Sequence, residues 1–355
     1  MKVLVVGAGF AGLSAALAAR AAGASVTIAH AGAGASALYA GVVDGSLAGL
    51  DGPAAAVLKQ LTAALGLRLS ETTVIATREG VLRPSAGADS ALLDLEPLAG
   101  KWVGVVDTPR DDWDGDLLAS AFTSSPWARA TGTRFEAVSV DLLEHGHERR
   151  IAAFDFAARF DQAERLKRLA GLLTERAGPA AWLLGPWLGI DTAVSTELSS
   201  LLGVPLGEVT SPPGGAAGGR FERRRDALFA SLSLVVVGRR VVGVAESETT
   251  LAVRFDDGGE LCPDALVLAS GGFVSGAVRL TGALSGETPA GFELGISGLP
   301  TPQLLGQPPT ATSSLFSVDF SILGARSLER VGLPVTTQGR VLGMRRVYAA
   351  GDAVC

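Results

Sequence analysis

The sequence predicts an α/β fold in which a parallel central sheet and a small β-meander are joined to an inserted α/β domain. Two observations carry this prediction: residues 3–12 read VLVVGAGFAG near the start of the chain, and residues 347–352 read VYAAGD near its end. The first pattern is typical of a buried strand, a glycine turn and the start of a helix, and the second of a strand that ends in an acid. A chain bracketed by both is expected to form a Rossmann-like nucleotide-binding domain.

The glycines of the first pattern follow the G-x-G-x-x-G spacing, and each has a physical reason. Gly7 allows a tight turn, Gly9 lets the backbone approach a phosphate, and Gly12 lets the helix pack closely on the strand. Phe10 and Ala11 begin that helix, whose first N–H groups would face the phosphate.

The elements around the glycine turn follow from residue type. An apolar β-branched run predicts a strand over 3–6, an Ala- and Leu-rich stretch predicts a helix over 11–22, and SVTIA predicts a strand over 25–29. A signal peptide is the alternative interpretation of Lys2 and the apolar stretch behind it. Three spaced glycines and a strand directly after the helix favour the nucleotide-binding turn.

One position departs from the dinucleotide pattern. An acid that holds the adenosine ribose is expected at the end of the second strand, and the chain has His30 there. A histidine cannot accept two ribose hydroxyl groups as a carboxylate does. The residue therefore favours a mononucleotide over a dinucleotide.

Composition narrows the class of protein. The chain has 355 residues, 48% of them hydrophobic and 19% charged, which is typical of a folded protein with a substantial core. The net charge is −6, and apart from Arg223–Arg225 no basic run stands out, so nucleic acid is not an expected partner. No apolar run outside the N-terminal segment is long enough for a membrane span.

The chain has only two cysteines, Cys262 and Cys355. This number excludes a disulfide framework, a cysteine-ligated zinc site and an iron–sulfur cluster held by this chain alone. The expected setting is the reducing cytoplasm. If electrons leave for iron–sulfur centres, those centres belong to a partner.

Along the chain we predict a discontinuous nucleotide-binding domain, residues 1–100 and 228–355, and an inserted α/β cap, residues 101–227. In the first part, residues 34–50 (GASALYAGVVDGSLAGL) are small and glycine-rich. A surface loop is one interpretation. A segment lying against a ligand is the other, with Ser36, Gly41 and Ser46 as candidate contacts.

Further elements are expected in sequence order: a helix over 53–66, a hairpin over 72–83 around Glu79-Gly80, a loop over 84–100, strands over 102–106, 135–142 and 181–184, and helices over 155–174 and 192–202.

The second half becomes β-rich after a loop or close-approach segment at 211–219. Strands over 232–238, 239–247 and 250–259 are expected to form a meander that returns to a central strand at 265–269. That strand ends in ASGGF, so Ala269, Gly271 and Gly272 are candidate ligand contacts at its carboxyl end.

The last predicted strand ends at Gly351 and Asp352, which are also candidate ligand contacts. A helix is expected after Asp352, and the sequence ends three residues later, so we expect the protein to continue beyond Cys355.

Taken together, these blocks resemble flavoproteins of the glutathione-reductase/fumarate-reductase type. The segments SALYAGVVDGSLAGL, AFDFAARFD, ALVLASGGFVSG, GLPVTT and VYAAGD occur in the order seen in the B subunit of anaerobic glycerol-3-phosphate dehydrogenase. The glycine and acid motifs are shared by many flavoproteins, and the first two segments point to this particular enzyme.

The resemblance implies a flavin-dependent oxidoreductase subunit that oxidises sn-glycerol 3-phosphate to dihydroxyacetone phosphate and passes electrons to the quinone pool. It implies a catalytic A subunit, a membrane-anchored iron–sulfur C subunit, and a peripheral location at the inner face of the membrane. The cofactor would be FMN or FAD, and His30 favours FMN. An electron-relay or scaffold subunit without a substrate site is one alternative, and an FAD-dependent oxidoreductase of the fumarate-reductase type is another.

No catalytic residue is assigned from the sequence. A phosphorylated substrate would suit arginine, for which Arg223, Arg224 and Arg225 are candidates, although a solvated helix face is the simpler interpretation. His145 and His147 flank Gly146 between acids, as in a surface turn.

Overall fold

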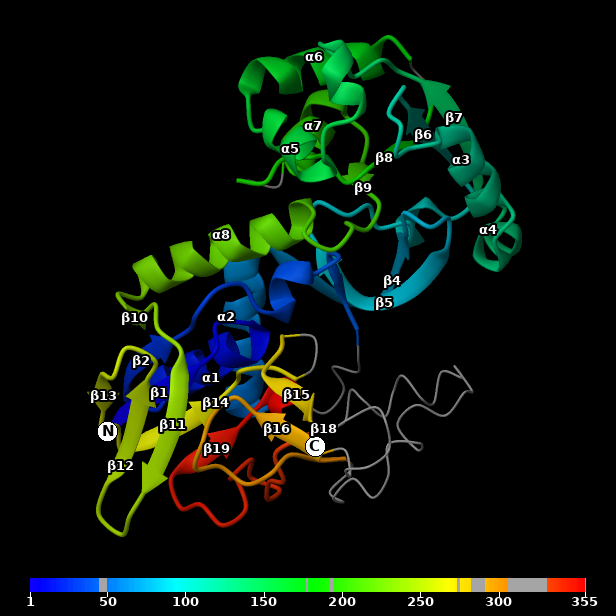
Figure 1. Cartoon of the computed structure of the whole chain (residues 1–355). Coiled ribbons are helices and arrows are strands. Elements are labelled where there is room, and N and C mark those ends of the chain that lie inside the picture. The colour runs from blue at the N-terminus through cyan, green and yellow to red at the C-terminus, as the bar shows by residue number, and fades with distance from the viewer. Residues whose placement is uncertain are drawn as a thin grey trace. The chain divides into compact units, whose positions relative to one another are not determined.

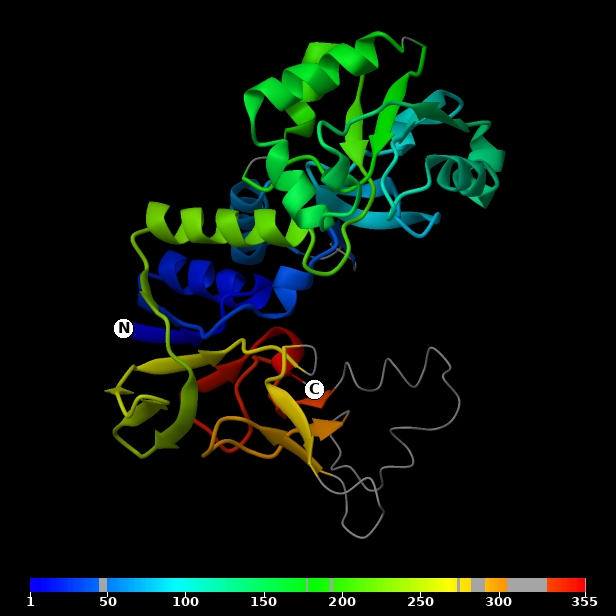
Figure 2. The same cartoon turned by 45° about the horizontal axis from the view of Figure 1, so that its top comes forward.

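The computed structural model describes residues 1–44, 50–176, 178–191, 194–272, 275–281, 291–304 and 331–354. The chain divides into two compact units, shown in Figures 1 and 2. The first comprises Met1–Ser36, Pro53–Leu61 and Ala227–Cys355, and the second Ala37–Gly52 and Thr62–Asp226. Residues 62–100 were expected in the nucleotide-binding domain, whereas here they pack with the second unit.

The first unit is built on a five-stranded sheet in the order β10-β2-β1-β14-β19. Every neighbouring pair in it is parallel. The elements of this sheet and its first helix are β1 Lys2–Val6, α1 Phe10–Ala21, β2 Ser25–Ala29, β10 Val235–Val237, β14 Ala265–Leu268 and β19 Val347–Ala349. The prediction of a parallel central sheet with a strand over residues 3–6 is confirmed.

A three-stranded antiparallel meander leads into the central strand β14. Its strands are β11 Val241–Glu246, β12 Leu251–Phe255 and β13 Glu260–Leu261. Apolar side chains of β11 and β12, among them Val244, Val253 and Phe255, join the core formed by Leu4, Leu266 and their neighbours. The remaining described elements of this unit are β15 Val278–Thr281, β16 Gly291–Leu294, β17 Gln303–Leu304, β18 Val331–Gly332 and the short helix Gly351–Ala353.

One strand was predicted in the wrong sheet. Residues 232–238 were expected to open the meander, but β10 pairs in parallel with β2. The reason is the helix α8, Ala216–Ser231, of which the sequence indicated only a helix face around Arg223–Arg225. A strand that follows a crossover helix is carried back parallel to the preceding strands.

The second unit contains a four-stranded parallel sheet in the order β7-β6-β8-β9 and an antiparallel sheet in the order β3-β5-β4. Helices cover both faces of the parallel sheet (Figure 2). Its elements are β3 Val42–Val43, β4 Leu67–Ala76, β5 Leu82–Asp89, β6 Trp102–Asp107, α3 Gly115–Thr123, α4 Pro126–Thr131, β7 Arg134–Ser139, α5 Ala153–Arg159, α6 Ala163–Thr174, β8 Ala181–Leu184, α7 Ser195–Leu202 and β9 Leu206–Glu208. Helix α2, Gly52–Leu65, and helix α8 each have residues assigned to both units.

Three predictions in this part of the chain need correction. The loop expected at 84–100 is in part strand, because β5 pairs with β4 as far as Asp89. The helix expected over 155–174 is two helices, because Asp161 leaves the helix and its carboxylate accepts hydrogen bonds from the N–H groups of Ile190 and Asp191. The segment 211–219, expected as a loop or a close-approach site, is partly helical, because α8 begins at Ala216.

The two glycines within α8 serve close packing. A Cβ on Gly218 would overlap the carbonyl oxygen of Ala37, and one on Gly219 would lie 2.6 Å from the ring of Phe154. The close-approach interpretation of this segment is therefore confirmed.

Candidate functional site

The carboxyl ends of three adjacent strands, β1, β14 and β19, meet at one edge of the first unit's sheet. From β1 the chain passes through α1 to β2 on one side, whereas β14 and β19 lie on the other side. The strand order therefore reverses between β1 and β14. Open α/β sheets bind their ligands in the crevice at such a point.

The first loop at this edge is shaped by glycine. Gly7 has a φ of +113°, and a Cβ there would overlap the carbonyl oxygen of Ala269 at the end of β14. A Cβ on Gly12 would overlap the carbonyl oxygen of Gly7. Side chains at either position would push α1 away from the sheet, so close packing requires both glycines.

Gly9 brings the loop against Ser36. A Cβ on Gly9 would lie 2.7 Å from the Ser36 hydroxyl oxygen, which accepts a hydrogen bond from the N–H of Phe10 at 3.2 Å. Ser36 thus holds the start of α1 from a segment that the sequence marked as a candidate ligand contact.

The other two loops close on the first. A Cβ on Gly351 would lie 2.6 Å from the Cβ of Ala11, and one on Gly272 would lie 2.9 Å from the carbonyl oxygen of Asp352. The loops after β1, β14 and β19 are therefore in contact through their backbones. A cluster of small residues at a sheet edge leaves the backbone accessible to a ligand.

The electrostatics at the start of helix α1 suit an anion. Gly9, the N-cap residue of α1, has no side chain to cap the helix, and the first turn of α1 has no acidic residue. The N–H groups of a first helical turn have no acceptor within the helix and carry a partial positive charge. They would favour a phosphate group.

Two buried polar atoms at the carboxyl ends of these strands have no hydrogen-bond partner within the described residues: Nδ1 of His30 and Oγ of Ser270. His30 follows β2 directly, and its backbone N–H donates to the carbonyl of Val237 at 3.1 Å. Ser270 follows β14. Buried polar groups are usually hydrogen-bonded, so a bound ligand is one explanation for both. Ser270 was not predicted from the sequence, although it stands between two residues that were proposed.

Most residues proposed from the sequence lie together at this edge: Gly7, Gly9, Phe10, Ala11, Gly12, Ser36, Ala269, Gly271, Gly272, Gly351 and Asp352. Gly41 belongs to the second unit, where it has a φ of +98° and faces the side chain of Leu92. Ser46 lies outside the described residues.

The arginines proposed for a phosphorylated substrate are engaged with acids. Arg223 pairs with Asp191, Arg224 with Asp89 at 3.2 Å, and Arg225 with Asp226 at 2.8 Å. Arg223 is exposed, as on a solvated helix face, whereas Arg224 and Arg225 are largely buried, so that interpretation is wrong for these two residues. His145 and His147 stack on each other with ring centroids 5.5 Å apart at an exposed turn.

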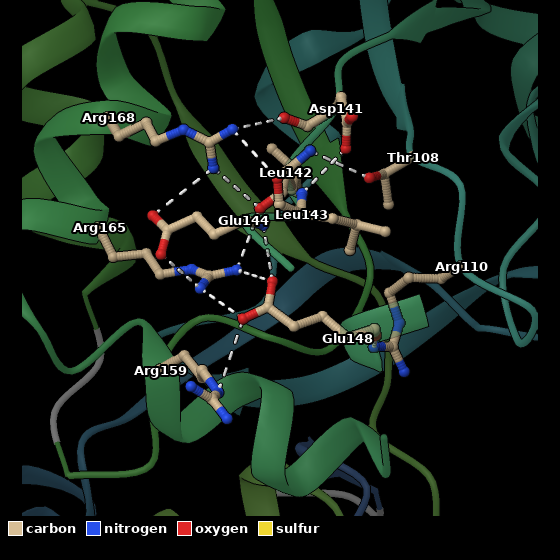
Figure 3. A network of polar contacts seen from close by, with 10 residues as sticks. All are labelled: Thr108, Arg110, Asp141, Leu142, Leu143, Glu144, Glu148, Arg159, Arg165 and Arg168. Carbon is tan, nitrogen blue, oxygen red and sulfur yellow. Dashed lines mark hydrogen bonds and ion pairs between the residues drawn. The ribbon is translucent and has the colours of Figure 1, made fainter. Parts of the chain in front are cut away.

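The polar side chains of the second unit form networks of a different kind. In Figure 3 the carboxylate of Glu148, which is fully buried, receives two hydrogen bonds of 2.7 Å from Arg165. Burial raises the pKa of Glu148, but Arg165 and the N–H of Glu144 outweigh it, so that pKa falls to about 2. Arg110 donates to the backbone carbonyl of Glu148 at 2.7 Å. The sequence gives no signal for this network, because its members are spread along the chain.

A second buried network centres on Arg220. Its guanidinium pairs with Glu208 at 2.6 Å and lies 3.5 Å from Asp89. Burial lowers the pKa of Arg220, but the two carboxylates outweigh it and raise that pKa. In both networks a buried arginine holds a buried carboxylate, that of Glu148 in one and that of Glu208 in the other.

In the described part of the chain, no group of His, Cys, Asp and Glu side chains could hold a metal ion. None of its helices combines the length and the hydrophobicity that crossing a bilayer requires.

No protein-family model and no curated protein sequence matches the chain. Solved structures similar to it include HpxO from Klebsiella pneumoniae complexed with FAD and uric acid, at 14% sequence identity over 76% of this chain and 39% of that chain, with a TM-score of 0.28. The peptidyl tryptophan dihydroxylase QhpG is similar at 14% identity over 99% of this chain and 60% of that chain, with a TM-score of 0.30. The iminodiacetate oxidase IdaA from Chelativorans sp. BNC1 is similar at 15% identity over 78% and 58% of the two chains, with a TM-score of 0.27. The chain thus spans about two fifths of HpxO and three fifths of QhpG.

Proposed function

We propose that the chain binds a flavin at the carboxyl edge of the first sheet and acts in a flavin-dependent oxidoreductase. The observation that carries this proposal is the contact between the Gly7–Gly12 turn, the Ala269–Gly272 loop and the Gly351-Asp352 turn. The N–H groups of the first turn of α1 would bind the phosphate, and Asp352 would accept hydrogen bonds from ribityl hydroxyl groups. A bound flavin would supply the acceptor for a hydride.

The residues present fit such a group. The loops at this edge are rich in glycine, the start of α1 has no competing acid, and the buried atoms of His30 and Ser270 have hydrogen-bonding capacity to offer. His30 in place of the ribose-binding acid supports FMN over FAD. Reverse-phase chromatography of cofactor released from the purified chain separates the two flavins.

The direct test is flavin binding by the full chain. Gly9→Val should abolish the yellow colour and the quenching of flavin fluorescence without unfolding the protein, because the added side chain would fill the approach to the phosphate. Gly34→Val is the matched control, since a Cβ at Gly34 meets nothing within 4 Å. Equal flavin binding by both variants, each folded by circular dichroism, would reject the proposed site.

We further propose, from the sequence blocks alone, that the substrate is sn-glycerol 3-phosphate and that the chain works with a catalytic A subunit and a membrane-anchored iron–sulfur C subunit. With two cysteines in the chain, electrons bound for quinone would leave through a partner. Oxidation of glycerol 3-phosphate with an artificial acceptor should be negligible for this chain alone and restored with the catalytic partner. Full turnover by this chain alone would show that the interpretation as one part of a complex is wrong.

A further inference from the structure

The second unit contains a cavity of about 600 Å³ at the carboxyl edge of its own parallel sheet. The segment after β6 contributes Arg110 and Trp113 to the lining, and the segment after β8 contributes Pro186 and Trp187. Its other lining residues also belong to this unit.

The topology places this cavity where ligands bind in open α/β sheets. From β6 the chain goes through α3 to β7 on one side, and from β8 it goes through α7 to β9 on the other side. Helix α3 packs on one face of the sheet and α7 on the opposite face, since their apolar residues belong to different core clusters. The carboxyl ends of β6 and β8 are therefore a point where the strand order reverses, with a crevice between the two connections.

One part of the lining is apolar. Trp113 and Trp187 pack edge to face with ring centroids 5.1 Å apart. Leu117, in the first turn of α3, also lines the cavity and remains 65% exposed. An exposed leucine beside an aromatic pair offers a surface for an apolar side group.

The charged part of the lining comprises three arginines and three aspartates, and most of them neutralise one another. Arg110 holds Asp112 through two hydrogen bonds of 2.9 Å, and Arg149 pairs with Asp111. Two charged residues of the lining, Arg78 and Asp114, are not neutralised by the other lining residues. Arg78 has an ion pair within the described residues only with Glu79, at 3.9 Å, and Asp114 forms none there, its Oδ1 accepting the N–H of Leu117.

We propose that this cavity binds a small zwitterion with an apolar side group, of the α-amino acid type. The ligand's carboxylate would pair with Arg78, its ammonium group with Asp114, and its side group would lie against Trp113 and Leu117. A phosphate dianion fits less well, because Asp114 and Asp116 stand at the start of α3 and repel it. All of these residues are distinct from those of the proposed flavin site.

The test is calorimetric titration of the full chain with three probes that share a phenyl ring: L-phenylalanine, phenethylamine and 3-phenylpropanoate. The second probe lacks the carboxylate, and the third lacks the ammonium group. We expect L-phenylalanine to bind about tenfold or more tightly than either, since each lost charge removes a charge-assisted contact. Equal binding of all three probes, or no binding of L-phenylalanine at millimolar concentration, would overturn the proposal.

Variants assign the two charges. Arg78→Gln should make L-phenylalanine and phenethylamine bind equally, and Asp114→Asn should make L-phenylalanine and 3-phenylpropanoate bind equally. Asparagine preserves the helix cap, so the second variant should fold normally. Arg83→Gln is the control, because Arg83 lies on the same hairpin with a similar exposure of 40%, against 38% for Arg78, and does not line the cavity. A discrimination among probes that survives in both Arg78→Gln and Asp114→Asn would also contradict the assignment.

Discussion

Each unit has a parallel sheet with a point where the strand order reverses. The residues at the carboxyl edge of the sheet differ between the two units. In the first unit the edge is made of glycine and backbone: Gly7, Gly12 and Gly272 let three loops approach one another, and no acid stands at the start of α1. In the second unit the edge is made of charged side chains, with Arg110 bound to Asp112 and Asp114 capping α3.

This difference teaches what each edge can bind. A helix start without acids, next to loops rich in glycine, favours an anion such as a phosphate. A helix start with Asp114 and Asp116 disfavours a phosphate, and the aromatic pair beside it favours an apolar group. We therefore propose different ligands for the same topological feature in the two units, because its side chains differ.

The comparison also predicts how each edge fails when it is changed. At the first edge, where glycines let the backbones approach, an added side chain should cause steric overlap, and its effect should not depend on pH. An edge built from charged side chains should lose binding or stability when a charge is removed, either by substitution or by protonation.

The largest effect is expected at Gly12 in helix α1. Gly12→Ala places a methyl group onto the carbonyl oxygen of Gly7, a backbone atom that cannot move without displacing α1 from the sheet. We expect a loss of more than about 3 kcal/mol of unfolding free energy, together with loss of flavin binding. Chemical denaturation measures the first effect and fluorescence titration the second.

Gly171→Ala is the control for this prediction. Gly171 is also a helical glycine, but a Cβ there meets nothing within 4 Å, so alanine should leave stability equal or improve it. If both variants behave alike, glycine at Gly12 is a matter of helix propensity and the backbone description of this edge is wrong.

The second largest effect is expected at Arg110, at the carboxyl edge of the second unit's sheet. Arg110, whose side chain is 1% exposed, binds Asp112 and the carbonyls of Glu148 and Ile151, and its guanidinium lies 4.5 Å from the ring centroid of Phe156. Arg110→Met keeps the packing and leaves these acceptors without a donor, which should cost about 3 kcal/mol of unfolding free energy. Arg134→Met, at an exposed arginine, should change it little. A neutral result at Arg110 would mean that this edge does not depend on its ion pairs.

The sequence predicted the first edge far better than the second, for a physical reason. Glycine spacing and strand ends are local patterns, and they placed Gly7, Gly12, Ala269 and Asp352 correctly at one edge. Contacts between distant side chains leave no such pattern, so the pairing of Glu148 with Arg165 could not be predicted. The start of helix α8 was missed because residues 211–219 were interpreted as a loop or a close-approach segment, although Gly218 and Gly219 are helical residues with tightly packed neighbours.

A smaller effect is expected from pH. In the folded protein the pKa of Glu148 falls from its ordinary value of 4.5 to about 2, so the folded state holds this proton less tightly than the unfolded state. The stabilisation from Glu148 is complete above about pH 5 and should be lost as the pH falls toward 2. Unfolding midpoints measured across this window should decline less steeply in Glu148→Gln than in the unchanged chain. Parallel slopes would show that Glu148 does not contribute.

The smallest effect is expected at Ser36, where the first edge does use a side chain. Its hydroxyl oxygen accepts the N–H of Phe10 at 3.2 Å, so Ser36→Ala should remove one net hydrogen bond of about 1 kcal/mol and weaken flavin binding roughly fivefold. Ser14→Ala is the matched control, because the Ser14 hydroxyl donates to the carbonyl of the same Phe10, at 2.9 Å, within the helix. Such bonds back along a helix contribute little to stability, so this variant should bind flavin normally. An effect of Ser36→Ala as large as that of Gly12→Ala would show that the first edge, like the second, depends on a side chain, and the contrast between the two edges would disappear.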